Sequence, residues 1–169
     1  MRRFVSAVTG LAMAACATAS SSQPEASKAA AGGETFQARL DARNEVPPPT
    51  LDANASPSGT ASFTVRGTSV AYKVDASGLS GPPVAAHIHT GAPGVAGPVI
   101  VPLTVAAGPS AGTATGEGTF DASAVKGKKA DGSAMTLDDV LAAMRSGGTY
   151  VNVHTANNKP GELRGQIEK

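Results

Sequence analysis

The chain has 169 residues, with 14 lysines and arginines against 13 acidic residues and three histidines. This near-neutral charge gives no support for nucleic-acid or anionic-lipid binding as the main role, and the absence of tryptophan leaves little aromatic surface for stacking bases or sugars. The single cysteine excludes a disulfide within the chain, so a folded domain must depend on its core or on a bound ion.

The N-terminus has the order of a secretory signal. Two arginines precede an apolar run from Phe4 to Ala15, which is too short to span a bilayer, and Cys16 follows directly. Small residues before a cysteine are typical of a bacterial lipoprotein signal, although Met13 stands where leucine is usual. We therefore predict a signal segment over residues 1–16, lipidation of Cys16, and a cell-envelope protein whose membrane contact is its lipid anchor only. The alternative is cleavage near Ala19, which would release a periplasmic or secreted protein.

Residues 17–33 consist mainly of Ala, Ser and Gly and cannot bury enough apolar surface to fold, so we expect a disordered tether. The domain is expected over residues 34–169. Short β-branched runs there, separated by Gly, Pro, Asn and Asp clusters, predict an all-β sandwich or barrel. The expected strands cover residues 36–42, 59–66, 69–76, 85–89, 99–105, 112–121, 149–154 and 162–167.

One segment departs from the β pattern and predicts a short helix across one end of the sheets. Thr136 is placed to cap it, apolar residues recur at helical spacing from Leu137 to Met144, and Gly147-Gly148 ends it.

The three histidines lie on two of the expected strands. Residues at i and i+2 of a strand share a face, so His87 and His89 point together, away from Ile88. The same parity places His154 opposite the valines of Val151-Asn152-Val153. If the apolar residues face the core, all three imidazoles face outward, under nearby loops such as residues 91–98.

Three neutral imidazoles that meet on one face predict a metal site formed by His87, His89 and His154. Such nitrogen donors suit Cu(II) or Zn(II), and the usual affinity order favours copper, whereas calcium prefers oxygen. The alternative is that the histidines make local hydrogen bonds and hold no ion. For the groups that would fix the imidazole tautomers, the nearest candidates are Asn152, Asn157, Glu162 and backbone carbonyls near Thr90.

Several other chemistries lack their motifs. With Cys16 in the leader and no G-x-S-x-G elbow, nucleophilic catalysis has little support. The chain also has no phosphate-binding loop and no dinucleotide fingerprint.

The segments AAHIHTG, GAPGVAGPVIVPL, YVNVHT and GELRGQI, with NEVPPP near the start, resemble the CHRD domain family, which is named after chordin and is common in bacterial exported proteins. The resemblance runs from about Glu34 to Glu168. It implies an immunoglobulin-like Greek-key β-sandwich or barrel, distantly similar to copper/zinc superoxide dismutase, but it implies no settled activity.

The dismutase comparison implies copper held on the outside of the barrel by an H-x-H pair and a late histidine, the pattern of His87, His89 and His154. This chain has no bridging histidine, no zinc-ligand cluster and no disulfide, which argues against redox cycling. Arg164 resembles a late arginine that steers anions, or it forms an ion pair with Glu162 or another acid.

We therefore expect a metal-binding module for sequestration, carriage or structural stability, with copper, or alternatively zinc, as the ion. One alternative is a superoxide dismutase-like copper oxidoreductase. The other is an extracellular protein-interaction module without metal, whose envelope or extracellular partner is unidentified.

Overall fold

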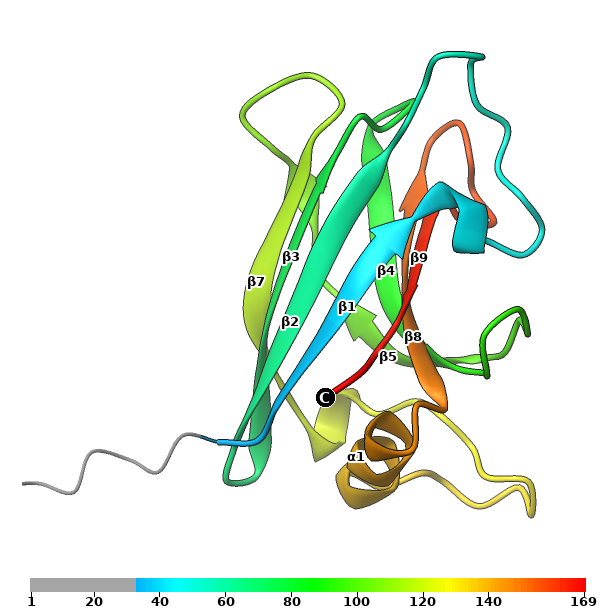
Figure 1. Ribbon diagram of the computed structural model, residues 1–169. Coiled ribbons are helices and arrows are strands. Elements are labelled where there is room, and N and C mark those ends of the chain that lie inside the picture. Colours follow the sequence, from blue (N-terminus) through cyan, green and yellow to red (C-terminus); the bar gives the residue numbers. More distant parts are fainter. Residues whose placement is uncertain (1–32) are drawn as a thin grey trace, which may run out of the picture. The chain divides into compact units, whose positions relative to one another are not determined.

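The computed structural model describes residues 33–169, which fold as a curled antiparallel β-sheet with one short helix (Figure 1). The all-β expectation is therefore confirmed. The elements are β1 (Thr35–Asp41), η1 (Ala42–Asn44), β2 (Ser58–Arg66), β3 (Ser69–Ser77), β4 (Pro83–Thr90), β5 (Val99–Leu103), β6 (Ala106–Ala107), β7 (Ala114–Asp121), η2 (Ala122–Ala124), α1 (Leu137–Arg145), β8 (Thr149–Thr155) and β9 (Leu163–Gln166).

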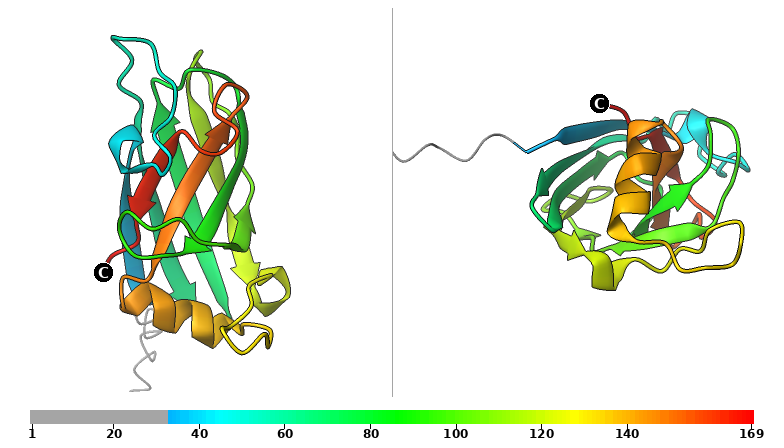
Figure 2. Two further views of the ribbon diagram at one scale, coloured as in Figure 1. Left: turned by 90° about the vertical axis from the view of Figure 1, so that its right-hand side faces the viewer. Right: turned by 90° about the horizontal axis from the view of Figure 1, so that it is seen from below.

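The nine strands form one sheet in the order β5-β4-β8-β9-β1-β2-β3-β7-β6. Its two outermost strands, β5 and β6, are consecutive in the chain and only Thr104 and Val105 separate them. This link crosses from one edge of the sheet to the other, and Tyr72 on β3 accepts a hydrogen bond from the Thr104 amide at 2.9 Å. The sheet therefore curls into a half-barrel (Figure 2).

The expectation of a single strand over residues 99–105 is wrong, and this crossing is the reason. The segment pairs with β4 as far as Leu103 and then leaves it, and Ala106 and Ala107 pair with β7 instead. The other expected strands and the helix are confirmed, with ends that differ by no more than two residues.

The core lies inside the curl and consists of alternate residues of the strands. On β1, for example, Phe36, Ala38 and Leu40 are buried while the residues between them are exposed. This period-2 alternation is that of a sheet with one face toward apolar side chains and one toward solvent.

Helix α1 lies across one end of the curled sheet (Figures 1 and 2). It starts with a capping box in which Thr136 and Asp139 exchange hydrogen bonds. Its apolar face joins the core, and Gly147 follows it with a φ of 68°, a backbone conformation that suits glycine.

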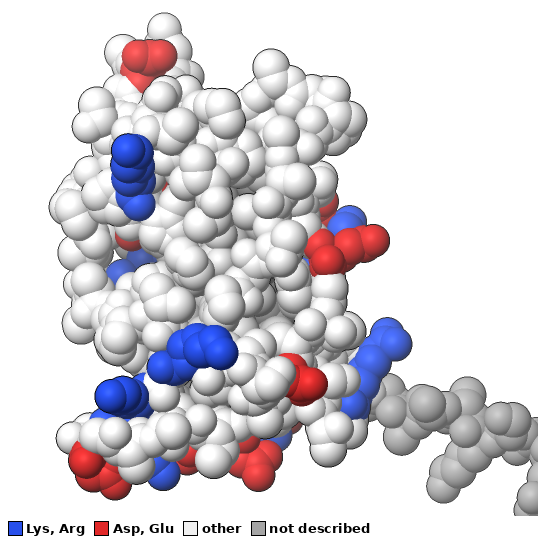
Figure 3. All heavy atoms as spheres, turned by 180° about the vertical axis from the view of Figure 1, so that it is seen from behind, with Lys and Arg blue, Asp and Glu red and all other residues white. Residues whose placement is uncertain are grey.

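None of the helices within residues 33–169 is long and apolar enough to cross a membrane. The predicted signal segment, Cys16 and the tether up to residue 32 lie outside the described residues. On the face drawn in Figure 3, charged side chains are sparse over the middle, and positive and negative groups are interspersed near the end that carries α1.

Candidate metal centre

The histidines lie on the neighbouring strands β4 and β8. These strands pair antiparallel, with Ala85 opposite His154 and His89 opposite Tyr150. Ile88 on β4 and Val153 on β8 are fully buried in the core. The three imidazoles therefore occupy the outer face of the sheet, as the strand parity predicts.

The loop over residues 91–98 covers this part of the outer face. The carbonyl of Gly97 contacts His89, and the carbonyls of Ala92 and Val95 each accept a hydrogen bond from Arg164 on β9 at 2.9 Å. The expected placement of the imidazoles beside this loop is thus confirmed for His89, which is only 9% exposed. His87 and His154 are partly buried.

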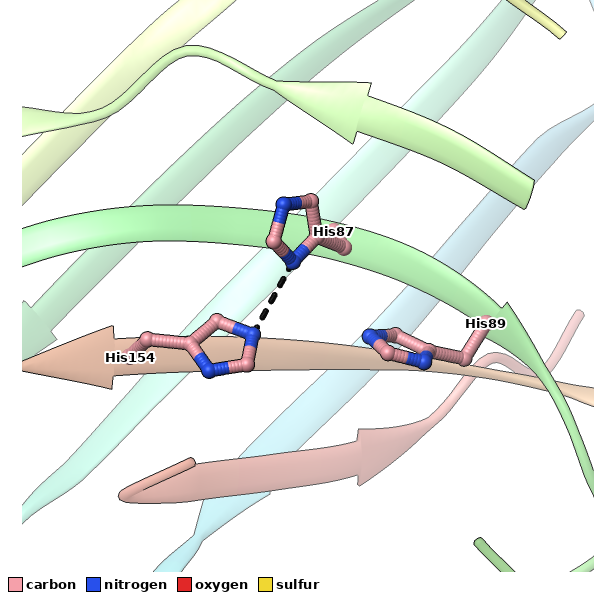
Figure 4. Close-up of side chains that lie close together, drawn as sticks. All are labelled: His87, His89 and His154. Carbon is pink, nitrogen blue, oxygen red and sulfur yellow. Dashed lines mark hydrogen bonds between the residues drawn. The ribbon is translucent and has the colours of Figure 1, made fainter. Parts of the chain in front are cut away.

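The structure brings the three rings together (Figure 4). One ring nitrogen from each of His87, His89 and His154 lies within 4.8 Å of the others. The shortest approach joins Nδ1 of His87 to Nε2 of His154, at 2.9 Å.

Two backbone carbonyls fix the ring tautomers. Nδ1 of His89 lies 2.9 Å from the Gly97 carbonyl oxygen, and Nδ1 of His154 lies 2.8 Å from that of Lys159. Because a carbonyl oxygen only accepts, each Nδ1 carries the proton and each Nε2 of a neutral ring presents a lone pair. The Nε2 lone pair of His154 accepts from His87, whereas the buried Nε2 of His89 has no hydrogen-bond partner.

Burial keeps the imidazoles in the neutral form that a metal requires. It lowers the pKa of His87 to about 4, helped by the neighbouring His154 and His89. Burial also lowers the pKa of His89 and His154, against the opposing effect of their hydrogen bonds to carbonyls. At neutral pH all three rings are therefore neutral rather than cationic, which is the protonation state in which an imidazole can bind a metal ion.

The donor set fits a copper or zinc ion. Metal–nitrogen bonds of 2.0–2.1 Å in tetrahedral geometry set the donor nitrogens about 3.3 Å apart. The separations within the trio range from 2.9 Å to at most 4.8 Å, and this range includes the spacing of about 3.3 Å. Three such nitrogens leave at least one coordination position for another ligand.

The side chains expected to orient the imidazoles form no hydrogen bond with them. Asn152 donates to the buried carboxylate of Glu45, Asn157 donates to the Ser80 carbonyl at 2.5 Å, and Glu162 has other partners. The imidazoles of His89 and His154 are oriented instead by the backbone carbonyls of residues 97 and 159, and not by one near Thr90. Backbone carbonyls are common to every residue, so no sequence pattern marks these two.

The expected ion pair between Arg164 and Glu162 does not form either. The Glu162 carboxylate accepts hydrogen bonds from Ser80, Thr155 and Asn158, which lower its pKa although burial opposes them. Arg164 instead stacks on Tyr150, with its guanidinium carbon 3.5 Å from the ring centroid. The strand parity already places Tyr150 on the histidine face, but the sequence does not indicate this stack.

A curled antiparallel sheet with three imidazoles on its outer wall defines a β-barrel-like domain with a candidate metal centre. A model of the CHRD domain matches residues 36–167, and the chain belongs to this family. No curated protein and no solved structure matches the chain. The distant similarity to copper/zinc superoxide dismutase therefore stays a prediction.

Proposed function

We propose that this CHRD domain binds one copper or zinc ion through His87, His89 and His154, for metal sequestration, carriage or structural stability. The observation that carries the proposal is the buried Nε2 of His89, which has no hydrogen-bond partner and faces the other two imidazoles. Leaving a buried polar atom unpaired costs about 1–3 kcal/mol. A metal ion provides the partner that this lone pair lacks.

The held tautomers support the same proposal. A metal-binding histidine commonly donates its second ring N–H to a carbonyl or carboxylate, which fixes the ring plane. His89 and His154 both make this contact with a backbone carbonyl. Binding an ion between these nitrogens breaks the His87–His154 hydrogen bond and moves the His87 proton from Nδ1 to Nε2, so the neutral rings coordinate without a net release of protons.

Copper is the leading ion because three neutral nitrogens bind it more strongly than zinc when both are available. We place the domain in the cell envelope, tethered through a lipid on Cys16 or released after cleavage near Ala19. Its membrane contact is then the anchor alone, nucleic acid is no partner, and an envelope or extracellular protein is a candidate partner.

The test is the metal content of the domain. The described residues from 33 to 169 form a compact unit, so the chain from Glu34 onward is expressed without a polyhistidine tag and equilibrated with copper and zinc. Mass spectrometry should find one ion per chain, and His87→Ala, His89→Ala and His154→Ala should each lose it. Lys159→Ala is the matched control, because it removes an exposed side chain and keeps the carbonyl that His154 uses. No stoichiometric metal in the parent would overturn the proposal and favour the interaction module.

One observation favours a second candidate, a superoxide dismutase-like copper enzyme. His87 and His154 are only partly buried, so a small molecule can approach an open coordination position from that side. A copper-loaded sample should then consume superoxide faster than the same amount of free copper, and His154→Ala should abolish the difference. A rate equal to that of free copper would overturn the enzyme candidate, and metal binding would then be the only proposed function.

A further inference from the structure

Arg164 is a buried cation with no carboxylate in ion-pair contact, although its charge lowers the pKa of the buried Glu45 against the larger opposing effect of burial. It is 1% exposed, and among residues 33–169 it forms no ion pair. Its Nη2 donates to the carbonyls of Ala92 and Val95, and its Nη1 has no hydrogen-bond partner. Burying a charge in this way is unfavourable unless other contacts compensate for the lost hydration.

Those contacts lead toward the candidate metal centre through a stack of three flat groups. The guanidinium of Arg164 lies over the ring of Tyr150, and the ring of His89 also stacks on Tyr150, with ring centroids 4.8 Å apart and planes inclined by 12°. The three groups come from the adjacent strands β9, β8 and β4. The plane of the His89 ring is therefore set by the plane of Tyr150, which Arg164 in turn holds.

The peptide of Gly97 connects the same groups a second time. The hydroxyl of Tyr150 accepts a hydrogen bond from the Gly97 amide at 3.1 Å, and the Gly97 carbonyl accepts the Nδ1 proton of His89. Arg164 binds this loop through Ala92 and Val95. It thus acts on His89 along two routes, through the tyrosine ring and through the loop that fixes the tautomer.

We propose that Arg164 is a positioning residue that holds the plane and the Nδ1-protonated tautomer of His89, through Tyr150 and the loop 91–98. The consequence for metal binding rests on the function proposed above, whereas the effect on the His89 tautomer does not. Lysine does not replace arginine here, because an ammonium lacks the flat face that stacks on Tyr150.

The experiment uses the same chain from Glu34 onward, and the first measurement is made without metal. Nitrogen-15 NMR of the imidazoles distinguishes the two neutral tautomers, and His154 is an internal control because its Nδ1 donates to the Lys159 carbonyl rather than to the loop 91–98. In R164M we expect His89 to change from one tautomer to a mixture while His154 keeps its own. R145M is the matched control, since Arg145 is a surface arginine paired with Glu34.

The second readout is copper. R164M should bind Cu(II) about tenfold more weakly, the lower end of the effect of losing a group that orients a ligand. Its paramagnetic resonance spectrum should also differ from that of the parent, whereas R145M should match the parent in both respects. Tyr150→Leu removes the middle of the stack and should reproduce the R164M result, and the double variant should be no worse than either single one.

The outcomes separate the two proposals. A parent that binds no copper, with a His89 tautomer that still depends on Arg164, would overturn the metal function and support the positioning role. An unchanged His89 tautomer and unchanged copper affinity in R164M would overturn the positioning role, as would an equal disturbance of His89 and His154. If R164M does not fold, R164K decides: it keeps the charge but loses the stack, so the His89 tautomer should again be mixed.

Discussion

At the scale of single residues, the candidate centre is built from imidazoles that stay neutral. The lowered pKa of His87, His89 and His154 has burial as its largest cause in each case. A neutral imidazole binds metal without first losing a proton from a charged ring. The same burial makes the stability of the metal-free protein depend on pH.

The sign of that dependence follows from the His87 pKa, about 4 in the folded chain against 6.5 in an unfolded one. Below pH 6.5 the unfolded chain takes up a proton that the folded chain refuses, so the free energy of unfolding falls as the pH drops from 6.5 toward 4. Urea unfolding of metal-free samples at several values between pH 7.5 and 5 measures this decline.

The matched comparison is His87→Gln, which keeps a polar side chain but does not titrate. Its stability should fall less steeply than that of the parent over the same interval. The difference between the two slopes isolates His87, because the buried Glu45, whose pKa burial raises, is present in both proteins. Equal slopes would show that the His87 ring is solvated rather than buried.

The sequence predicts part of this site well. Parity along two strands places His87, His89 and His154 on one face because side chains alternate strictly in a strand. Parity gives no information on what lies above that face. The carbonyls of Gly97 and Lys159, and the stack of Arg164 on Tyr150, depend on how loops fold back over the sheet.

At the scale of elements, the loop 91–98 follows β4 and returns over the outer face. Its close approach requires glycine at position 97, where an added Cβ would lie 1.7 Å from the Thr90 carbonyl oxygen. The amide of Thr90 donates to the Pro98 carbonyl at 3.2 Å, which closes the base of the loop. The backbone at Gly97 therefore lies near His89 only as long as residue 97 has no side chain.

Gly97→Ala should displace the loop and remove the Gly97 carbonyl from His89. We expect copper affinity to fall at least tenfold, because a metal ligand loses the group that orients it. Stability should fall by about 1–3 kcal/mol, as for other overpacked sites. Isothermal titration and thermal unfolding measure the two effects.

Val95→Ala is the control within the same loop, because that side chain is 55% exposed and only its backbone carbonyl contacts Arg164. It should bind copper like the parent. Parent-like copper binding by Gly97→Ala would mean that the loop does not orient His89.

The elements themselves were largely predictable from the sequence. Alternating apolar residues and turn-forming clusters define the strands, and the Thr136 cap with its apolar spacing defines α1. The exception is the single strand expected over residues 99–105, because β5 ends at Leu103 and a separate strand, β6, begins at Ala106. Its division at Thr104 arises because one end pairs with β4 and the other with β7, a long-range relation that local pattern does not contain.

At the scale of the whole molecule, the backbone between β5 and β6 connects the two edges of the sheet. With one cysteine, the chain has no internal disulfide to reinforce this connection. The domain is thus held by one core and by hydrogen bonds. An ion that binds only the folded form adds its binding free energy to folding, about 2.7 kcal/mol at a concentration a hundredfold above Kd.

Metal should therefore raise the melting temperature of the parent. With zinc at a hundredfold excess over Kd we expect a rise of about 10 °C. Calorimetry with zinc and with a chelator measures it, and the rise should vanish in His154→Ala. A rise of equal size in that variant would place the stabilising ion elsewhere on the chain.

The loop 91–98 meets the candidate centre through its backbone, while the side chain of Val95 points into solvent. The side chain at position 95 can therefore be exchanged while the backbone contact with Arg164 stays in place. A fluorophore attached there would lie two residues from the Gly97 carbonyl that contacts His89. Position 95 is thus an attachment point for a reporter of the metal binding that we propose.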